Sequence, residues 1–341
     1  MKKHMNSIKD VAALAGVSVK TVSRILNGYE GVSPKTAEKV DKAMKELEYY
    51  PSAAAQALKG VGAGIVSLIT DSLTTTPYSY GIVAGIQDIC EKNGLLLMIG
   101  ETGGNMANFS KLVDDFRRQR AQAIILATVY HREVEITQAF KQCPLILVNC
   151  FEKNTTHPTI LPDDEKGAFD ATSHLISKGH TRIASLTLFE EMVATDLRLQ
   201  GYKTAHKEHN IEIDNDLIRR GVFRDDNDEF VDLEDVLREL MALPNPPTAI
   251  MCGNDKMAMR VFMLVRGVMG YKIPEQISIV GYDNYKMIAE NLVPKLSTVT
   301  LPYFSMGQLA AKLAISEDQT AETHKVSGEF VERLSILNKH N

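Results

Sequence analysis

The sequence predicts an α/β protein with two parts: a small, all-helical N-terminal domain and a larger body of two doubly wound parallel-sheet lobes. Three observations predict this fold class. The first fifty residues contain short amphipathic helical patterns separated by a turn. From Ile65 onward, short apolar segments alternate with amphipathic helical segments. The length of 341 residues exceeds one compact domain, and a hydrophobic fraction of 44% is ample for large cores.

The first helix is expected from the spacing of its apolar residues. Ile8, Val11, Ala12 and Ala15 recur at i, i+3, i+4 and i+7, so they form one apolar face. Gly16 follows, and glycine adopts at little cost the left-handed conformation that ends a helix. The helix therefore ends at a Gly-Val-Ser turn.

The second helix begins after this turn, where Ser18 can serve as its N-cap. Its buried side is expected to consist of Val22, Ile25 and Leu26. Five residues remain exposed at its start and outer side: Val19, Lys20, Thr21, Ser23 and Arg24. Two short helices joined in this way are typical of a helix-turn-helix, whose second helix enters the DNA major groove. The alternative is an ordinary helical hairpin.

A third helix is expected from about Pro34 to Leu47, with Ser33 as its cap and proline at its first position. The alanine-rich stretch that follows Pro51 is short, and helices under about twelve residues are marginal in water. We expect this stretch to become ordered only against a partner. Three glycines then form a flexible joint: Gly60, Gly62 and Gly64.

The body is expected to contain parallel sheets, because strand and helix patterns alternate along it. The expected strands are Ile65–Ile69, Leu95–Ile99, Ala123–Leu126, Leu145–Val148, Ile183–Leu186, Ala249–Cys252 and Ile277–Val280, with a last one near Phe330–Leu337. The expected helices include Ile82–Lys92, Phe109–Gln119, Gly167–Ser177, Arg198–His209 and Asp255–Arg266. A shift near Leu161–Pro162 indicates two successive lobes. Ligands of such sheets bind at the carboxyl ends of the strands, so the cleft between the lobes is the expected pocket. The acidic segment Asp225–Asp235 is expected to be a solvated loop or a helix start.

The charge is unevenly distributed along the chain. The whole sequence carries −5, but residues 1–60 carry +4 and the remainder carries −9. A basic head on an acidic body suits a nucleic-acid-facing domain with a separate second task. No signal peptide is visible, and no apolar run approaches the roughly 18–20 residues that span a bilayer. We therefore expect a cytoplasmic protein with no membrane partner.

The sequence contains no motif that is typical of an enzyme or of a metal site. It contains no G-x-S-x-G, no phosphate-binding loop ending in Gly-Lys-Ser/Thr and no H-E-x-x-H. Four scattered cysteines are expected to be reduced thiols: Cys90, Cys143, Cys150 and Cys252. We expect no enzyme activity, no cofactor and no metal. A periplasmic sugar receptor remains an alternative, although it would need an export signal.

Five motifs occur in order across about 280 residues. They are Val17-Ser18-x-x-Thr21-Val22-Ser23-Arg24-x-Leu26-Asn27, Tyr50-Pro51-x-Ala53-x-Ala55-x-x-Leu58, Gly179-His180-Thr181-Arg182-Ile183, Arg198-Leu-x-Gly201-Tyr202 and Val280-Gly281-Tyr282-Asp283-Asn284. In these motifs the chain resembles the lactose-repressor/galactose-repressor (LacI/GalR) family of transcription factors. The resemblance implies an operator-binding homodimer with a periplasmic-binding-protein-like sensor body.

The resemblance also implies a division of the chain. Residues 1–50 form the helix-turn-helix domain, and residues 51–62 form a hinge helix and linker. Residues 63–341 form the effector-binding and dimerisation domain. Within it, the first lobe comprises about 63–161 and 294–325, and the second comprises about 162–293 and 326–341.

Residues that contact DNA can be carried over from the family by position. Val19, Lys20 and Arg24 are the expected base readers, since arginine and lysine can donate to guanine and valine can contact a thymine methyl. The expected phosphate contacts are Thr21, Ser23, Asn27, Ser33 and Thr36, with helix capping or solvent exposure as the alternative for Thr21 and Ser23. In the hinge helix, Ala55 and Leu58 are expected at the minor groove. There Leu58 would act as an apolar wedge, unless it packs on the body instead. Two hinge segments meeting at a dyad imply a pseudo-palindromic operator of roughly 14–20 base pairs.

The expected effector contacts are also carried over by position. They are Arg198, Asp283, Asn254, Asn149, Tyr78 as an aromatic wall, Phe223 as a weaker aromatic candidate, and Asp163, which with Asp164 lies at the crossover between lobes. Three residues at or near these motifs have a structural alternative to ligand binding. Asp255 is expected to cap the helix after it, His180 to be a structural hydrogen bonder, and Asn149 could instead satisfy loop backbone.

The effector itself is expected to be a sugar or sugar derivative, because arginine and carboxylates suit hydroxyl groups, with a purine as the alternative. The regulated genes would then be those of a carbohydrate-utilisation operon, and both induction and co-repression remain open. No leucine heptad follows the last expected strand, so we expect a dimer rather than a tetramer.

Overall fold

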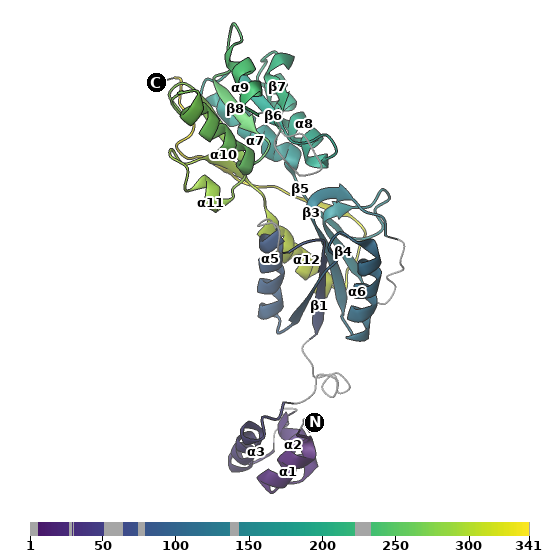
Figure 1. Cartoon of the computed structure of the whole chain (residues 1–341). Coiled ribbons are helices and arrows are strands. Elements are labelled where there is room, and N and C mark those ends of the chain that lie inside the picture. The colour runs from purple at the N-terminus through teal and green to yellow at the C-terminus, as the bar shows by residue number, and fades with distance from the viewer. Residues whose placement is uncertain are drawn as a thin grey trace. The chain divides into compact units, whose positions relative to one another are not determined.

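The computed structural model describes residues 6–26, 29, 31–50, 64–73, 79–136, 143–221 and 233–340. The chain divides into two compact units, Met1–Gly64 and Ile65–Asn341 (Figure 1). The expected hinge helix, the expected contacts Asn27, Ala55 and Leu58, and the expected aromatic residues Tyr78 and Phe223 lie outside the described residues.

Within its described residues, the N-terminal unit contains three helices: α1 (Ile8–Ala15), α2 (Val19–Leu26) and α3 (Pro34–Glu46). Its core is formed by the apolar stripes that the spacing predicts. The buried members are Val11, Ala12, Ala15, Val22, Val40 and Ala43, with Ile8, Val17, Ile25, Leu26, Met44, Leu47 and Tyr49 packed against them. The helix-turn-helix prediction is therefore confirmed in its packing.

Local side chains fix where these helices start and stop. Gly16 has a φ of 66°, the left-handed conformation that ends α1. The hydroxyl of Ser18 accepts a hydrogen bond from the Thr21 backbone N–H at 3.1 Å, and that of Ser33 accepts one from Thr36 at 3.2 Å. The predicted caps of the second and third helices are thus both present.

The body contains two six-stranded sheets. The first has the order β11-β5-β4-β3-β1-β2 and is parallel throughout; the second has the order β12-β10-β9-β8-β6-β7 and is parallel except for its edge strand β12. The strands of the first are β1 (Ile65–Thr70), β2 (Leu96–Glu101), β3 (Ala123–Glu133), β4 (Leu145–Phe151), β5 (Thr159–Pro162) and β11 (Thr323–Val326). Those of the second are β6 (Ile183–Thr187), β7 (Ile218–Arg220), β8 (Ala249–Cys252), β9 (Ser278–Asp283), β10 (Ser297–Thr300) and β12 (Phe330–Val331).

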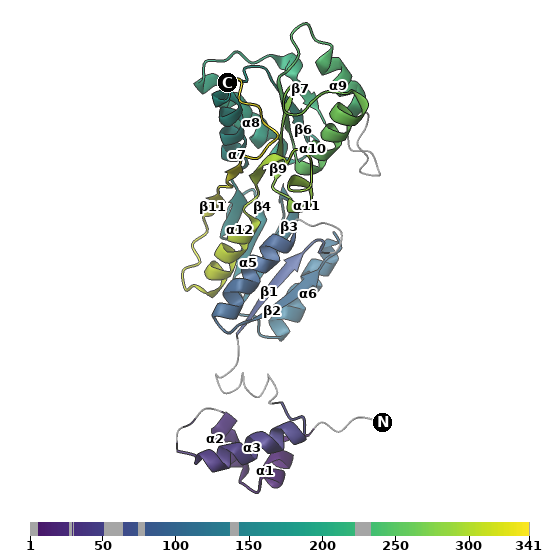
Figure 2. The ribbon, with the colours of Figure 1, turned by 90° about the vertical axis from the view of Figure 1, so that its left-hand side faces the viewer.

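Helices cover both faces of each sheet (Figures 1 and 2). In the first lobe they are α5 (Ser79–Lys92) and α12 (Tyr303–Ile315) on one face and α6 (Met106–Arg118) on the other. In the second lobe they are α7 (Asp164–Ser177) and α8 (Val193–Glu208) on one face, with α9 (Leu233–Met241) and α10 (Asp255–Phe262) on the other, and the short α11 (Lys286–Ala289) beside α10. This is the doubly wound architecture that the alternation predicts.

The chain passes between the lobes three times: from β5 to α7, from β10 to α12 and from β11 to β12. The second crossing differs from the expected division, which assigns residues 294–325 to the first lobe. β10 belongs to the second sheet, because Ser297–Thr300 pairs with Val280–Asp283 of β9. The chain changes lobe only after Thr300, and Pro302 is the N-cap residue just before α12.

All seven internal strands expected from the sequence are present, as β1, β2, β3, β4, β6, β8 and β9. Four short strands have no counterpart among the expectations: β5, β7, β10 and β11. The expected helix Asp255–Arg266 is α-helical only to Phe262 and continues as a π-helix over Met263–Val268. Within the described part of the chain, no helix is long and apolar enough to cross a membrane.

Candidate functional site

A cavity lies between the lobes at the carboxyl ends of the strands, with a free volume of about 50 Å³. Its wall is built by both lobes. The first contributes Val129, Tyr130, His131, Asn149, Pro162 and Tyr303, and the second contributes Asp164, Leu188, Met192, Ala194, Arg198, Asn254, Asp283 and Leu301. Strand ends meeting across a crossover are where ligands bind in open α/β sheets.

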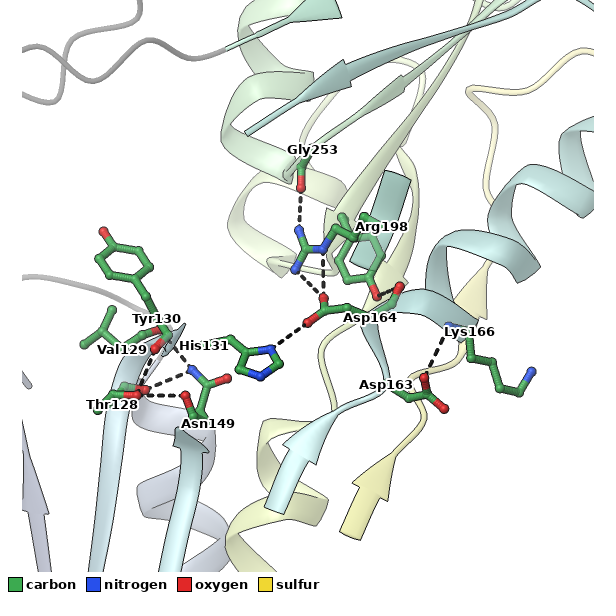
Figure 3. Close-up of polar contacts among 11 residues, drawn as sticks. Thr128, Val129, Tyr130, His131, Asn149, Asp163, Asp164, Lys166, Arg198 and Gly253 are labelled. Atoms are coloured by element: carbon green, nitrogen blue, oxygen red, sulfur yellow. Dashed lines mark hydrogen bonds and ion pairs between the residues drawn. The ribbon is translucent and has the colours of Figure 1, made fainter. Parts of the chain in front are cut away.

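The second-lobe wall centres on an ion pair between Arg198 on α8 and Asp164 at the start of α7 (Figure 3). Nε of Arg198 donates to the Asp164 carboxylate at 2.8 Å, and Nη1 donates to the backbone carbonyl of Gly253. The guanidinium also lies 3.6 Å from the centre of the Tyr282 ring, as in a cation–π contact. Arg198 is therefore held in one orientation at the cavity.

Electrostatics keep this pair ionised. Burial by itself would raise the pKa of Asp164, but the charge of Arg198 and hydrogen bonds from His131 and Arg198 outweigh it and hold that pKa below its usual range. The pKa of Arg198 is raised. Burial alone would lower this pKa, but the combined effect of Asp164, Tyr282 and Asp283, with Asp164 first among them, outweighs burial. The two charges compensate each other inside the protein.

The close packing of α7 and α8 brings this pair together. Gly201 lies one turn after Arg198, and a Cβ atom there would overlap the backbone carbonyl of Glu165. Glycine at this position thus lets α8 approach α7. The expected motif Arg-Leu-x-Gly-Tyr accordingly combines a charged cavity residue with the glycine that allows its placement.

The first-lobe wall is formed where β3 departs from regular pairing. Ala127 pairs with Val148 and Arg132 pairs with Cys150, so residues 128–131 lie opposite a single residue of β4. Such a bulge bends the strand and redirects its side chains. Here it carries Val129, Tyr130 and His131 into the cavity.

Asn149 lies within β4 opposite this bulge, with a φ of 57°. Its Nδ2 donates to the carbonyl oxygens of Thr128 at 2.9 Å and Val129 at 3.2 Å (Figure 3). Asn149 therefore satisfies loop backbone, as its structural alternative predicts, and it also lines the cavity; its contact with an effector stays a prediction.

Asp283 ends β9 in an unusual backbone conformation. Its φ is 123° and that of Asn284 is 54°, and such conformations persist in non-glycine residues only where surrounding contacts impose them. The Tyr285 backbone N–H donates to Asp255 Oδ2 at 2.7 Å, and Arg333 Nη2 donates to Asn284 Oδ1 at 2.7 Å. These contacts fix the loop that brings Asp283 to the cavity.

Asp255 corrects one expectation. It does not cap α10: Asn254 is the N-cap, and its Oδ1 accepts from the Met257 N–H at 2.8 Å. Asp255 is instead fully buried, where it accepts hydrogen bonds from Thr298 Oγ1 at 2.6 Å and from Tyr285. The cap must lie just before the helix, and Asp255 is already its first residue.

Four of the seven expected effector contacts line the cavity: Asn149, Arg198, Asn254 and Asp283. Asp163 does not; its carboxylate accepts from the Lys166 N–H at 3.3 Å and caps α7. One residue further on, the chain has entered the helix and the side chain of Asp164 reaches the cavity. His180 is structural, as expected, since its ring bonds Thr248 and the Leu337 carbonyl, both at 2.9 Å.

The sequence patterns do not predict three polar residues of the cavity: Tyr130, His131 and Tyr303. His131 lies beyond the expected end of its strand, and Tyr303 begins a helix that was not expected. Burial and the charges of Asp283 and Asp164 raise the pKa of Tyr303, so its hydroxyl stays protonated. Among the residues whose placement is described, no group of His, Cys, Asp and Glu side chains could hold a metal ion.

The N-terminal unit presents a separate candidate nucleic-acid interface on α2. Val19 is 42% exposed, Lys20 and Arg24 are exposed, and Thr21 and Ser23 are half-buried. Ser33 and Thr36 lie at the start of α3, where their hydroxyls are 2.8 Å apart. The expected base readers thus point away from the core of this unit.

Comparisons with known proteins agree with both units. A model of bacterial regulatory proteins of the lacI family matches residues 7–52, and one of a periplasmic binding protein-like domain matches residues 172–336. The HTH-type transcriptional repressor PurR of Vibrio vulnificus is 32% identical over 323 residues, covering 94% of each chain. The ribose operon repressor of Escherichia coli is 31% identical, covering 91% of this chain and 92% of its own.

Solved structures resemble the chain over the same span. The lac repressor dimer bound to operator and the anti-inducer ONPF is 25% identical with a TM-score of 0.79, covering 97% of this chain and 99% of its own. The complex of the transcriptional regulator CelR with cellobiose is 27% identical with a TM-score of 0.64 and the same coverage. Full-length relatives above 30% identity, a helix-turn-helix and a two-lobed body together show that the chain belongs to the LacI family of bacterial DNA-binding transcriptional repressors.

Proposed function

We propose that the protein binds a pseudo-palindromic operator as a homodimer, and that a sugar or sugar derivative bound between its lobes sets the operator affinity of this repressor. One observation carries the proposal: Arg198, Asp164, Asp283, Asn149 and Asn254 line a single cavity at the crossover between two sheets. The regulated genes would then serve carbohydrate use.

The chemistry of the wall suits hydroxyl groups, which both donate and accept hydrogen bonds. A guanidinium offers donors in a fixed fork, carboxylates offer acceptors, and carboxamides offer both. The remaining wall is apolar or aromatic, with Leu188, Met192, Leu301 and Tyr130. A few convergent polar groups in an apolar setting are typical of small-molecule sites.

The size of the cavity supports a mechanism based on lobe movement. Its free volume of about 50 Å³ is well below the roughly 300–1,000 Å³ of typical ligand sites, so a sugar requires the lobes to separate. The three chain segments that cross between the lobes would bend as the lobes move. A ligand that prefers one lobe arrangement by about 1–3 kcal/mol would shift operator affinity through the hinge segments 51–62 of the dimer.

The experiment is an operator-binding titration. A duplex selected from genomic fragments is titrated with protein in the presence and absence of ribose, glucose or cellobiose, and a sugar that changes the dissociation constant supports the proposal. Replacing the hinge alanines Ala53, Ala54, Ala55 and Ala57 by glycine should abolish this response. An unchanged response in that variant contradicts the role of residues 51–62 in transmitting the effect of the sugar to the operator.

The alternative effector is a purine, and the same titration with adenine, guanine and hypoxanthine tests it. The aromatic side chains Tyr130 and Tyr303 at the cavity could stack on a flat base. A response to a purine with none to sugars would replace the sugar by the purine and leave the operator-binding role intact.

A further inference from the structure

His131 has a buried imidazole in the cavity wall, and one of its two ring nitrogens has no hydrogen-bond partner among the described residues. The residue is 6% exposed, and its Nδ1 lies 3.4 Å from Asp164 Oδ2 (Figure 3). Its Nε2 is buried and has no hydrogen-bond partner among the described residues. A buried polar atom without a partner destabilises the folded protein, so the position of this atom at a cavity indicates that a ligand contacts it.

The direction of the ring's hydrogen bonds follows from its neighbour. The Asp164 carboxylate can only accept, so Nδ1 of His131 carries the proton in this contact. In the neutral imidazole the other nitrogen is then an acceptor. In that form Nε2 matches a ligand group that donates a hydrogen, such as a hydroxyl.

A second acceptor lines the same cavity at Asn149. Its Nδ2 donates to two carbonyl oxygens, those of Thr128 and Val129, which fixes the orientation of the carboxamide. Its Oδ1 is buried and accepts no hydrogen bond of standard geometry within the described residues, although the carboxamide lies close enough to the Tyr303 hydroxyl to lower the pKa of that group. The first-lobe wall thus offers two acceptors, from neighbouring strands, to one ligand.

The charges of the cavity argue against an anionic ligand. Arg198 is the one permanent cation among its described lining residues, and the Asp164 carboxylate already balances it at 2.8 Å. Asp283 adds a further negative charge to the wall. A phosphate or carboxylate entering this cavity would approach two carboxylates, those of Asp164 and Asp283, and like charges brought together in a desolvated site repel.

We infer that His131 is a specificity-determining residue of the effector site, which accepts a hydrogen bond from a hydroxyl of a neutral, hydroxyl-rich sugar, and that sugar phosphates and sugar acids are excluded. The inference rests on the proposed function, which leaves the charge of the sugar derivative open.

The first experiment compares neutral sugars with their charged counterparts on the full-length protein. Thermal unfolding and calorimetric titration are carried out with ribose, glucose and cellobiose, and with ribose 5-phosphate, glucose 6-phosphate and gluconate. We expect at least one neutral sugar to stabilise the protein and to bind at least tenfold more tightly than its charged counterpart. Tighter binding of a phosphate or an acid, or binding by none of the neutral sugars, overturns the inference.

The second experiment separates a ligand contact from a structural role. His131→Asn retains a side-chain nitrogen near the position of Nδ1 and thus the contact with Asp164, but it lacks Nε2. His131→Gln reaches the position of Nε2. We expect the asparagine variant to bind the neutral sugar at least tenfold more weakly and the glutamine variant to remain within about threefold of the original protein, which corresponds to under 1 kcal/mol.

His157→Asn is the matched control, because His157 is a half-buried imidazole of the first lobe, 2.8 Å from Glu152, and does not line the cavity. It should bind the sugar normally. Equal affinity of the original protein and His131→Asn overturns the role of His131. A neutral sugar that binds with this dependence on His131 but leaves operator affinity unchanged would contradict the proposed function and not the inference. An anionic compound that changes operator affinity would contradict the inference and not the proposed function.

Discussion

The carboxylate of Asp164 lies 2.8 Å from the guanidinium of Arg198, and their side chains are only 1% and 11% exposed. The two residues come from the start of α7 and the first half of α8, and the contact of these helices decides their distance. Because both charges are removed from water, each depends on the other. The ion pair that forms part of the cavity wall therefore also contributes to the stability of the second lobe.

Removing Arg198 should destabilise the body strongly. Arg198→Ala leaves the Asp164 carboxylate buried without its cation, and breaking a buried pair from one side costs about 3–5 kcal/mol. Urea unfolding at pH 7 measures this loss. Arg238→Ala is the control, because Arg238 pairs with Glu234 on an exposed helix face and should lose no more than about 1 kcal/mol. Equal losses in the two variants would contradict the account of the buried pair.

Gly201 should be required for the contact between α7 and α8. In Gly201→Ala the added Cβ overlaps the Glu165 carbonyl, so the helices must separate. We expect a loss of about 1–3 kcal/mol in unfolding free energy and weaker effector binding, because Arg198 moves away from Asp164. Gly267→Ala, where the added Cβ meets open space, should be neutral or slightly stabilising. If urea unfolding shows no difference between the two variants, the close approach is not needed.

Asp255 should make the folded protein less stable as the pH rises. Burial raises its pKa from 3.8 to about 6, although hydrogen bonds from Thr298 and Tyr285 act in the opposite direction. The folded state therefore binds this proton more tightly than the unfolded chain, and the free energy of unfolding falls between about pH 4 and pH 6. The full effect corresponds to roughly 3 kcal/mol.

The measurement is urea unfolding of the original protein and Asp255→Asn at pH 4, 5, 6 and 7. The stability of the variant relative to the original protein should rise across this range and level off above pH 6. Asp41→Asn, at an exposed carboxylate of α3, is the control and should run parallel to the original protein. Parallel curves for Asp255→Asn would show that Asp255 ionises at its ordinary pKa.

Arg24 and Lys20 should matter for DNA and not for folding. Both are exposed on α2, so their replacement by alanine should leave the thermal unfolding of the protein unchanged. Loss of a base-reading arginine should cost about 1–3 kcal/mol of operator affinity and relax specificity at one base pair. Lys45→Ala is the charge-matched control, since Lys45 pairs with Asp41 on α3. A similar loss of operator affinity in the control, measured by gel shift at fixed salt, would indicate a nonspecific charge effect.

The sequence predicts those parts of the structure that local patterns determine. The apolar stripes of the first three helices, the left-handed Gly16 and the caps Ser18 and Ser33 all follow from spacing and residue type. Asn149, Asn254 and Asp283 could be placed near one another because each lies one to three residues after the end of an expected strand. Parallel strands bring their carboxyl ends to one edge, so position along the chain becomes position in space.

The remaining features depend on contacts between distant segments. His131 reaches the cavity only through the bulge of β3 against β4, which no local pattern of residues 128–131 reveals. Asp164 rather than Asp163 faces the cavity because α7 begins between them. Asp255 is the first residue of α10 rather than its cap, and its carboxylate accepts a hydrogen bond from Thr298, 43 residues away. The roles of these residues thus depend on where an element begins or on contacts between distant segments, and not on residue type alone.

The central claim is that a ligand in the cavity between the lobes sets the affinity of the protein for its operator. The most direct measurement is the operator dissociation constant, with and without the bound sugar, for the original protein and for Asp283→Asn. We expect equal operator binding by both proteins without sugar, and a change of at least tenfold on adding sugar to the original protein alone. An identical response of the two proteins, or no preference for any genomic fragment over random duplex, would contradict it.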